Sequence, residues 1–362
     1  MTTATALRDL CKNPATILSR YRDSGVRTIG YTCSYVPEEL MISAGLQPFR
    51  ITNIGADVSA LVPSFVCPFA SAALENMIRL EDFFDGFVVA HTCDPMWRLY
   101  DILKAKISKP LFLLRVPHST DNEPSFEFFK LELMRFRRFL EENFKATIDE
   151  DALFGATRLC NENRSLLKSV YMSNANGHFK INALDRFPLV LASMWMPKPE
   201  INAQINQLHF EDGKSDGSVR LHLNGTSIYD MDLIRMIGES GGFIASDDLC
   251  TGSRYFWSNV EESEDPVSAL AYRYLKRTPC PSQGPIEERL EYINFMIKEF
   301  RAQGVIVFAG RFCDPILYDS VHIRNMLSKN GVTTTLIDYE NTTQELGRIK
   351  TRVEAFIESI GG

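Results

Sequence analysis

Residues 86–95, GFVVAHTCDP, and residues 304–315, GVIVFAGRFCDP, carry the same signal at two distant points of the chain. In each passage an apolar run of the kind that forms a buried strand ends in Cys-Asp-Pro. Aspartate near an N-cap, followed by proline in the first turn, is a helix-start signal. Both passages therefore predict a strand that leads directly into a helix, with a cysteine at the junction.

The two cysteines, Cys93 and Cys313, are expected just past the carboxyl end of a strand and at the N-terminus of a helix. Open α/β sheets bind their ligands at that edge. A helix N-terminus also lowers the pKa of a thiol and so favours the thiolate. A matched pair of such positions suggests a site for a soft metal ion or a metal cluster.

The same order of elements occurs twice in the chain. Short apolar runs alternate with amphipathic stretches in both halves, which predicts an α/β fold with largely parallel sheets. We expect two Rossmann-like lobes that face a cleft and are joined by a helical segment. The expected parts are an N-terminal helical segment (1–26), a first lobe (27–145), a helical middle segment (146–216) and a second lobe (217–362).

Other cysteines occupy related places in this repeat. Cys67 lies between the second and third expected strands of the first lobe, and Cys250 has the equivalent place in the second lobe. Cys33, after the first strand, is expected on the same rim. Three or four converging thiolates suit zinc or an iron–sulfur cluster, although cleft-lining thiols without a metal would give the same pattern. The remaining cysteines are expected to have no part in the cleft: Cys11, Cys160 and Cys280.

The composition argues against several classes of protein. The 362 residues are 45% hydrophobic and 23% charged, as in soluble globular proteins, and no run approaches the about 20 apolar residues that cross a bilayer. A net charge of −7 without a basic stripe argues against nucleic-acid binding. The N-terminus lacks a signal-peptide profile, so we expect a cytoplasmic protein whose eight cysteines do not form a disulfide framework.

Several longer motifs extend the pattern. They are YTCSYVPEEL (31–40), AGLQPFR (44–50), HTCD (91–94), RLYD (98–101), DDLCTGSR (247–254), FCDP (312–315) and TRVEAF (351–356). Together they resemble the 2-hydroxyacyl-CoA dehydratase and benzoyl-CoA reductase family, and the resemblance runs from about residue 13 to residue 358. It implies that Cys67, Cys93 and Cys313 hold an iron–sulfur cluster, either [4Fe-4S] or a double-cubane variant. Cys250 and Cys33 rank behind them as metal ligands.

The resemblance also implies an activity and partners. Members of this family receive one electron at very low potential from a separate, ATP-dependent iron–sulfur activator. Dehydratases use that electron to make a ketyl radical of a CoA thioester, so that an unactivated β-proton can leave. The resemblance thus implies radical dehydration of a 2-hydroxyacyl-CoA, in a dimer with a homologous subunit or a second copy of this chain. The chain has no GxxxxGKS-type phosphate loop, so ATP hydrolysis is expected elsewhere.

Alternative functions stay open at this point. The chain could be a reductase subunit, acting on an aryl-CoA or, as a homodimeric double-cubane protein, on small molecules. It could also be an electron-relay or structural subunit whose partner holds the substrate. Family members commonly carry Arg-Ser shortly after the first ligand cysteine, whereas this chain has Ala70-Ser71. The missing cation would alter the potential of a cluster and puts the usual substrate in question.

Two residues near the expected cleft are candidates for catalysis. Glu39, beside Glu38, begins the first helix of the first lobe, and His91 ends the strand before Cys93. Each has a structural interpretation too, as a helix-start carboxylate or as a hydrogen-bonded histidine at a strand end. Further polar residues are expected to cap helices (Asp94 and Asp314) or to form a polar cluster on a cleft loop (Asp247, Asp248 and Arg254).

Overall fold

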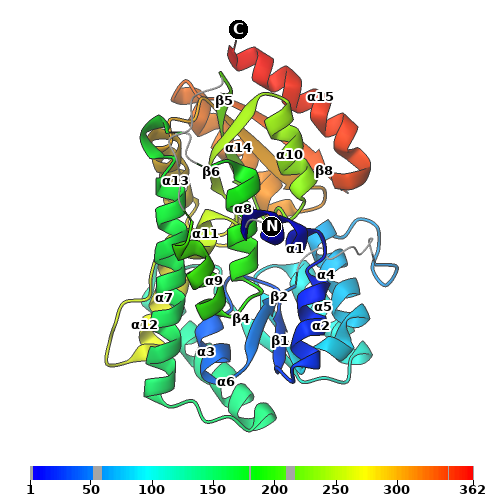
Figure 1. Cartoon of the computed structure of the whole chain (residues 1–362), viewed down its shortest axis with the longest axis vertical. Coiled ribbons are helices and arrows are strands. Elements are labelled where there is room, and N and C mark those ends of the chain that lie inside the picture. Colours follow the sequence, from blue (N-terminus) through cyan, green and yellow to red (C-terminus); the bar gives the residue numbers. More distant parts are fainter. Residues whose placement is uncertain (1–2, 52–58, 179–180, 209–216, 341, 362) are drawn as a thin grey trace.

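The computed structural model describes residues 3–51, 59–178, 181–208, 217–340 and 342–361. These residues form two separate four-stranded sheets, in which all paired strands are parallel. Figure 1 shows the first sheet (blue to cyan) in the lower part of the molecule and the second sheet in the upper part. The predicted α/β class with two Rossmann-like lobes is confirmed.

The first sheet has the strand order β2-β1-β3-β4. Its strands are β1 (Thr28–Tyr31), β2 (Gln47–Arg50), β3 (Gly86–His91) and β4 (Leu111–Arg115). The helical elements between these strands are α3 (Glu38–Ser43), α4 (Pro68–Arg79), η1 (Glu81–Phe83) and α5 (Asp94–Lys106). Because β1 pairs with both β2 and β3, the order of the strands reverses between β1 and β3. That reversal is the topological switch point, where open α/β sheets bind ligands.

The second sheet repeats this order as β6-β5-β7-β8. Its strands are β5 (Val219–Gly225), β6 (Gly242–Asp248), β7 (Gly304–Gly310) and β8 (Thr333–Tyr339). Its helices are α10 (Met231–Glu239), α11 (Ser253–Phe256), α12 (Pro266–Lys276), α13 (Ile286–Glu299), α14 (Asp314–Lys329) and α15 (Thr342–Gly361). The corresponding switch point lies between β5 and β7.

The other helices surround and join the two sheets. They are α1 (Thr3–Lys12), α2 (Ala15–Asp23), α6 (Glu123–Phe144), α7 (Glu150–Met172), η2 (Ala175–Gly177), α8 (Ala183–Ser193) and α9 (Lys198–Asn206). The long helix α7 runs along one side of the molecule from the first sheet towards the second (Figure 1). Helix α12 belongs to the second lobe in sequence, yet its Leu270 and Tyr274 pack in the apolar core around the first sheet. The chain therefore crosses between the lobes more than once.

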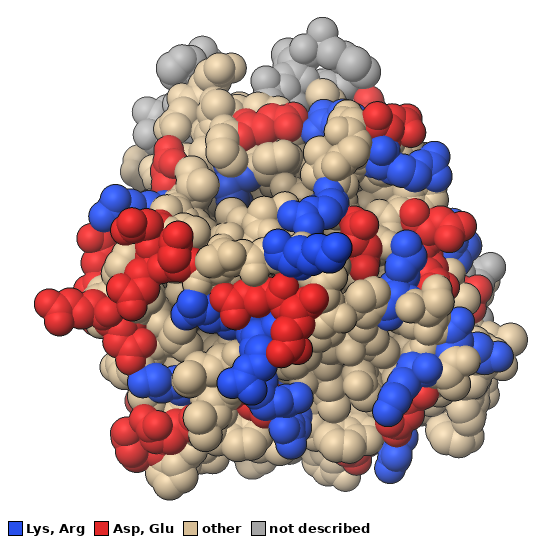
Figure 2. Space-filling view, turned by 90° about the horizontal axis from the view of Figure 1, so that it is seen from below, with Lys and Arg blue, Asp and Glu red and all other residues tan. Residues whose placement is uncertain are grey.

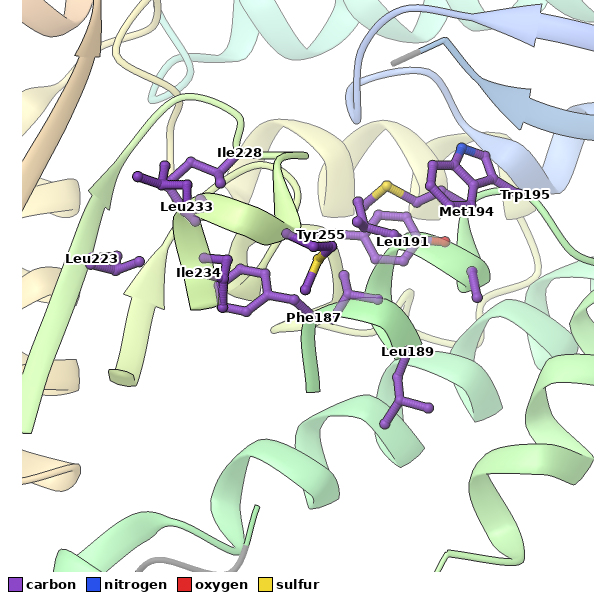
Figure 3. Close-up of a cluster of buried hydrophobic side chains, with 14 of the residues drawn as sticks. Phe187, Leu189, Leu191, Met194, Trp195, Leu223, Ile228, Leu233, Ile234 and Tyr255 are labelled. Carbon is purple, nitrogen blue, oxygen red and sulfur yellow. The ribbon is translucent and has the colours of Figure 1, made fainter. Parts of the chain in front are cut away.

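Helix α8 and the residues after it lie in the apolar core that ties the lobes together (Figure 3). Trp195 stacks on Phe49, with ring centroids 6.0 Å apart, and its indole N–H donates to the main-chain oxygen of Arg50 at 3.1 Å. On the other side Phe187 lies beside Ile234 of α10, in the second lobe (Figure 3). Side chains from both lobes thus share one contiguous core.

Two strands of the second sheet are longer than the sequence predicts. The Asn224-Gly225 pair is a sequence signal for a turn, but β5 continues through Gly225. Strand β6 likewise continues through Asp247 and Asp248, which were expected on a cleft loop. Asn224 and Asp248 are opposite each other in the ladder, and the Asn224 amide donates to Asp248 Oδ2 at 2.8 Å. Polar side chains that bond to each other across strands can be buried, so polarity here does not mark a loop.

The charge on the surface of the molecule is mixed. On the face shown in Figure 2, acidic and basic side chains are interspersed, unlike the continuous basic surface of nucleic-acid-binding proteins. Among the described residues, no helix combines the length and the apolar character needed to cross a bilayer.

The shared core predicts a large effect for Leu191→Ala. Leu191 is 1% exposed in the cluster of Figure 3, and truncating a buried leucine leaves a cavity that costs about 2–5 kcal/mol of unfolding free energy. Leu131→Ala is the matched control, because Leu131 is 59% exposed on α6 and its loss should change stability by less than about 0.5 kcal/mol. Urea unfolding followed by circular dichroism measures the unfolding free energy of both variants. Equal losses would contradict the placement of Leu191 in the shared core.

Candidate functional site

Three cysteines each occupy the N-cap position of a helix, with proline in the first turn that follows. Cys67 precedes α4, Cys93 precedes α5 and Cys313 precedes α14. Proline suits the first turn because its φ is already helical and its missing N–H would have no partner there. The predicted position of Cys93 and Cys313 at helix N-termini is confirmed. Asp94 and Asp314, predicted as caps, are instead the first helical residues, because the cysteines take the cap position.

These three thiols come from both lobes and lie close together. The thiols of Cys67 and Cys313 are hydrogen-bonded to each other. A Cβ placed on Gly310, the last residue of β7, would lie 3.7 Å from Cδ of Pro68, so the two chain segments are in contact. The charge of Cys67 raises the pKa of Cys93, which places this third thiol nearby. The first lobe thus supplies two thiols and the second lobe one.

Burial opposes the effect of the helix N-termini on these thiols. The hydrogen bond from Cys313 lowers the pKa of Cys67 to about 7, aided by the N–H groups of Ala70 and Phe69. Burial raises the pKa of Cys93 to about 12, and the pKa of Cys313 is raised by the hydrogen bond to Cys67 and by burial. The lowering predicted for Cys93 and Cys313 therefore does not occur, because burial at Cys93, and the bond to Cys67 together with burial at Cys313, outweigh the helix dipole.

Three more thiols surround this group. Cys33 and Cys250 were predicted near the cleft, whereas Cys280 was expected to have no part in it. The charge of Cys280 nevertheless contributes to raising the pKa values of Cys33, Cys93 and Cys313, so this thiol lies within electrostatic range of the site. Cys280 lies between two prolines and outside any strand. The repeated pattern of strands and helices therefore could not place it, and the flanking prolines were the only local sign of a rigid turn.

Buried arginines surround the thiols as well: Arg50, Arg254, Arg277 and Arg289. Arg50 donates to Cys250 twice, from Nη1 to the main-chain oxygen at 2.6 Å and from Nη2 to Sγ at 3.0 Å. Arg277 donates to the main-chain oxygen and the hydroxyl of Ser34, at 2.6 and 2.8 Å. Neither of these two guanidiniums has a carboxylate partner within the part of the chain that the structure describes. The site therefore carries a surplus of buried positive charge.

This donor set fits an iron–sulfur cluster. Thiolates are the ligands that such clusters take, and buried arginines compensate the negative charge that thiolates and sulfide bring. In the described ranges, no three His, Cys, Asp or Glu side chains are grouped closely enough to hold a single metal ion. Cys67, Cys93 and Cys313 could hold a cluster, and that assignment stays a prediction.

Glu39, a candidate catalytic residue, lies in a fully buried ion pair with Arg164. Its other carboxylate oxygen accepts a hydrogen bond from Tyr274 at 2.8 Å. Burial opposes ionisation, but the charges of Arg164 and Arg273 outweigh it, and the pKa of Glu39 is lowered. Glu38 is similarly bonded, to Lys198 Nζ at 2.8 Å among other groups. These contacts are typical of structural carboxylates, and a catalytic role for Glu39 stays a prediction.

His91, the other catalytic candidate, ends β3 two residues before Cys93. Its ring packs edge-on against Trp97, with centroids 4.5 Å apart, and the ring of His118 lies 6.4 Å away. Burial and the nearby His118 lower the pKa of His91. The lowered pKa favours the neutral form of this partly exposed imidazole.

Known proteins are similar to this chain in sequence. The family model described as "2-hydroxyglutaryl-CoA dehydratase, D-component" matches residues 33–360. The chain belongs to this family. The matched range contains all three helix-capping cysteines of the site.

Individual relatives match over nearly their full length. The chain is 25% identical to the (R)-phenyllactyl-CoA dehydratase beta subunit of Clostridium sporogenes, over 98% of this chain and 97% of that one. It is 27% identical to the beta subunit of (R)-2-hydroxyglutaryl-CoA dehydratase from Acidaminococcus fermentans, over 96% of each chain. It is 26% identical to a subunit of benzoyl-CoA reductase from Thauera aromatica, over 93% and 92%. The predicted family and enzyme class, dehydratase-like or a related reductase, are confirmed.

The buried pair predicts that Glu39→Gln destabilises the fold. The substitution leaves Arg164 buried without a counter-charge, which costs about 3–5 kcal/mol of unfolding free energy. Glu141→Gln is the control, because Glu141 pairs with Arg137 on the partly exposed surface of α6 and such pairs contribute about 0.5 kcal/mol. Chemical denaturation measures both variants, and a loss no larger than that of the control would contradict the role of the pair.

The same pair predicts a dependence on pH. Because the pKa of Glu39 is lower in the folded chain than its unfolded value of about 4.3, its contribution is complete above the unfolded pKa and is lost as the pH falls through the folded one. Unfolding free energies measured from about pH 6 downwards should therefore fall more steeply for the wild type than for Glu39→Gln. Parallel curves would contradict the lowered pKa.

Proposed function

We propose that this chain is the iron–sulfur subunit of a two-component, ATP-dependent enzyme that dehydrates a 2-hydroxyacyl-CoA by radical chemistry. The convergence of Cys67, Cys93 and Cys313 from three helix N-termini, among buried arginines that outnumber their carboxylate partners, carries the proposal. A bound iron–sulfur cluster would supply the thioester with a low-potential electron.

The residues of the chain would share the remaining tasks. Three thiolate ligands would hold the cluster and leave one iron position open to substrate, as open positions distinguish catalytic from structural zinc sites. The buried arginines would compensate the negative charge there. We assign proton transfer to His91, because its partly exposed imidazole ends β3 two residues before Cys93. The carboxylate of Glu39 is already bonded on both oxygens, and we assign it to positioning α3 against α7.

A homologous partner subunit, or a second copy of this chain, would complete the site. Two of the relatives are named as beta subunits. Exposed apolar side chains lie near the thiols in sequence: Phe65 (66% exposed) and Phe312 close to Cys67 and Cys313, and Tyr318 (76% exposed) on α14. Exposed aromatic groups of this kind are typical of protein interfaces. A separate ATP-dependent iron–sulfur activator would be a second, transient partner, in the reducing cytoplasm that keeps the thiols free.

A reductase function is the second candidate, as the subunit of an aryl-CoA reductase or as a homodimeric double-cubane protein. The identity to the benzoyl-CoA reductase subunit, 26%, lies between those to the two dehydratase subunits. Ala70 also suggests that the substrate differs from the one common in the family. Its methyl group is buried in the apolar core, at the position where the family resemblance leads us to expect an arginine.

An activity assay with all components separates these functions. The chain is purified anaerobically with its homologous partner and a low-potential iron–sulfur activator, and 2-hydroxyacyl-CoA and aryl-CoA substrates are offered with ATP. We expect loss of water from the 2-hydroxyacyl-CoA, at a rate that vanishes without ATP or activator. Ring reduction of the aryl-CoA alone would favour the reductase. CoA-thioester binding only by the partner would favour an electron-relay role.

The cluster ligands predict which cysteines control iron content. Cys93→Ala and Cys313→Ala are expected to lose most of the iron and sulfide, because each removes one of three ligands. Cys160→Ala is the control, because Cys160 is buried inside the packing of α7. Cys250→Ala should also keep its iron, because the main-chain oxygen that Arg50 bonds is still present. Iron and sulfide analysis with electron paramagnetic resonance measures this. Full retention of iron in Cys93→Ala or Cys313→Ala would refute the assignment.

A further inference from the structure

Arg254 and Arg289 lie at the carboxyl end of the second sheet. Arg254 belongs to α11, which follows β6, and Arg289 belongs to the first turn of α13. Their side chains are 1% and 0% exposed. Each guanidinium has one carboxylate partner: Arg254 Nε lies 3.2 Å from Asp248 Oδ1, and Arg289 forms an ion pair with Asp319.

Several donors of the two guanidiniums are unused. Nη2 of Arg254 donates to the main-chain oxygen of Gly225 at 2.8 Å. In contrast, Nη1 of Arg254 and both Nε and Nη1 of Arg289 have no hydrogen-bond acceptor among the residues that the structure describes. The buried side-chain amide of Gln283 also has no partner there for its nitrogen or its oxygen. Buried donors without acceptors are costly, since they lose water and gain nothing in return. Several such donors on Arg254 and Arg289, whose charges act on each other, are typical of a site whose acceptor is a ligand.

The charges point to an anion as that ligand. Within the described ranges, the four buried arginines of the site are matched by only two carboxylates, those of Asp248 and Asp319. Burial lowers the pKa of Arg289 to about 10, although Asp248 acts in the opposite direction. A guanidinium presents its N–H groups as a planar fork, which matches the two oxygens of a carboxylate.

We propose that Arg254 and Arg289, with the Gln283 amide, form a buried binding site for a carboxylate. The site adjoins the thiols, because Cys280 acts on both guanidiniums and also on the nearby thiols. The carboxylate is either the terminal group of an acyl-CoA substrate, in which case the inference rests on the proposed function, or a free small carboxylate.

Two CoA thioesters test whether the site binds the terminal carboxylate of an acyl-CoA substrate. Glutaryl-CoA and pentanoyl-CoA have acyl chains of equal length and differ in a terminal carboxylate against a methyl group. Calorimetry with the full chain, purified anaerobically, should show about tenfold or more tighter binding of glutaryl-CoA, as two charge-assisted hydrogen bonds imply. Arg289→Gln should remove this preference. Formate and acetate test whether the site binds a free small carboxylate. Either anion should raise the melting temperature of the chain relative to chloride at equal ionic strength.

Arg220→Gln is the matched control. Arg220 is also buried, but its guanidinium donates to the main-chain oxygens of Phe300, His178 and Asn174. Its replacement should lower stability and leave every carboxylate response unchanged. Gln283→Leu is a milder second variant of the proposed site, in case Arg289→Gln does not fold, and it should weaken the same responses.

The outcomes separate the two proposals. If the chain prefers glutaryl-CoA and this preference depends on Arg289, the site binds the carboxylate of the substrate. If only formate or acetate stabilises the chain, and this also depends on Arg289, the site binds a free small carboxylate. No response to any carboxylate, or responses that survive Arg289→Gln and Gln283→Leu alike, would overturn it. Failure of both CoA thioesters to bind would count against the proposed function, while the formate and acetate arm still decides the site.

Discussion

The contact between Arg50 and Cys250 joins the carboxyl ends of the two sheets, and the rest of the site depends on it. Arg50 is the last residue of β2, and Cys250 follows β6 in the other lobe. The guanidinium bonds both the main-chain oxygen and the thiol of Cys250, while Trp195 bonds the main-chain oxygen of Arg50 from the shared core. Helix N-termini that begin at these strand ends are thereby brought face to face, together with the cysteines that cap them.

Electrostatics make this junction chemically unusual. A buried guanidinium ordinarily has a carboxylate partner, because an unpaired charge in a low-dielectric interior is costly. Within the described chain, Arg50 and Arg277 instead bond to main-chain oxygens, a hydroxyl and sulfur atoms. The fold thus tolerates positive charge at the place where thiols gather. Negative charge brought by a thiolate-bound cluster or by an acyl carboxylate would be compensated there, so the proposed cofactor and the proposed anion site have a common physical basis.

Much of the architecture could be predicted from the sequence because its signals are local. The apolar run before Cys93 predicted a strand, and Cys-Asp-Pro predicted a helix start, and both are present. The repeated order of elements predicted two parallel sheets, and the structure gives both the same strand order. The position of Cys280 and the burial of Asp247 and Asp248 within a strand could not be predicted this way. They depend on partners more than twenty residues away, such as Asn224 for Asp248.

The sequence by itself determined many elements of this protein, the duplicated order that arranges them into two sheets, and the helix N-termini at which Cys93 and Cys313 lie. Backbone propensity, capping and apolar periodicity act over a few residues, so a single sequence reveals them. The tertiary structure decided which of the eight cysteines meet, that burial outweighs the helix dipole at Cys93, and that Glu39 is bonded to Arg164. Desolvation and ion pairing depend on distances between segments far apart in the chain, and only the packed fold sets those distances.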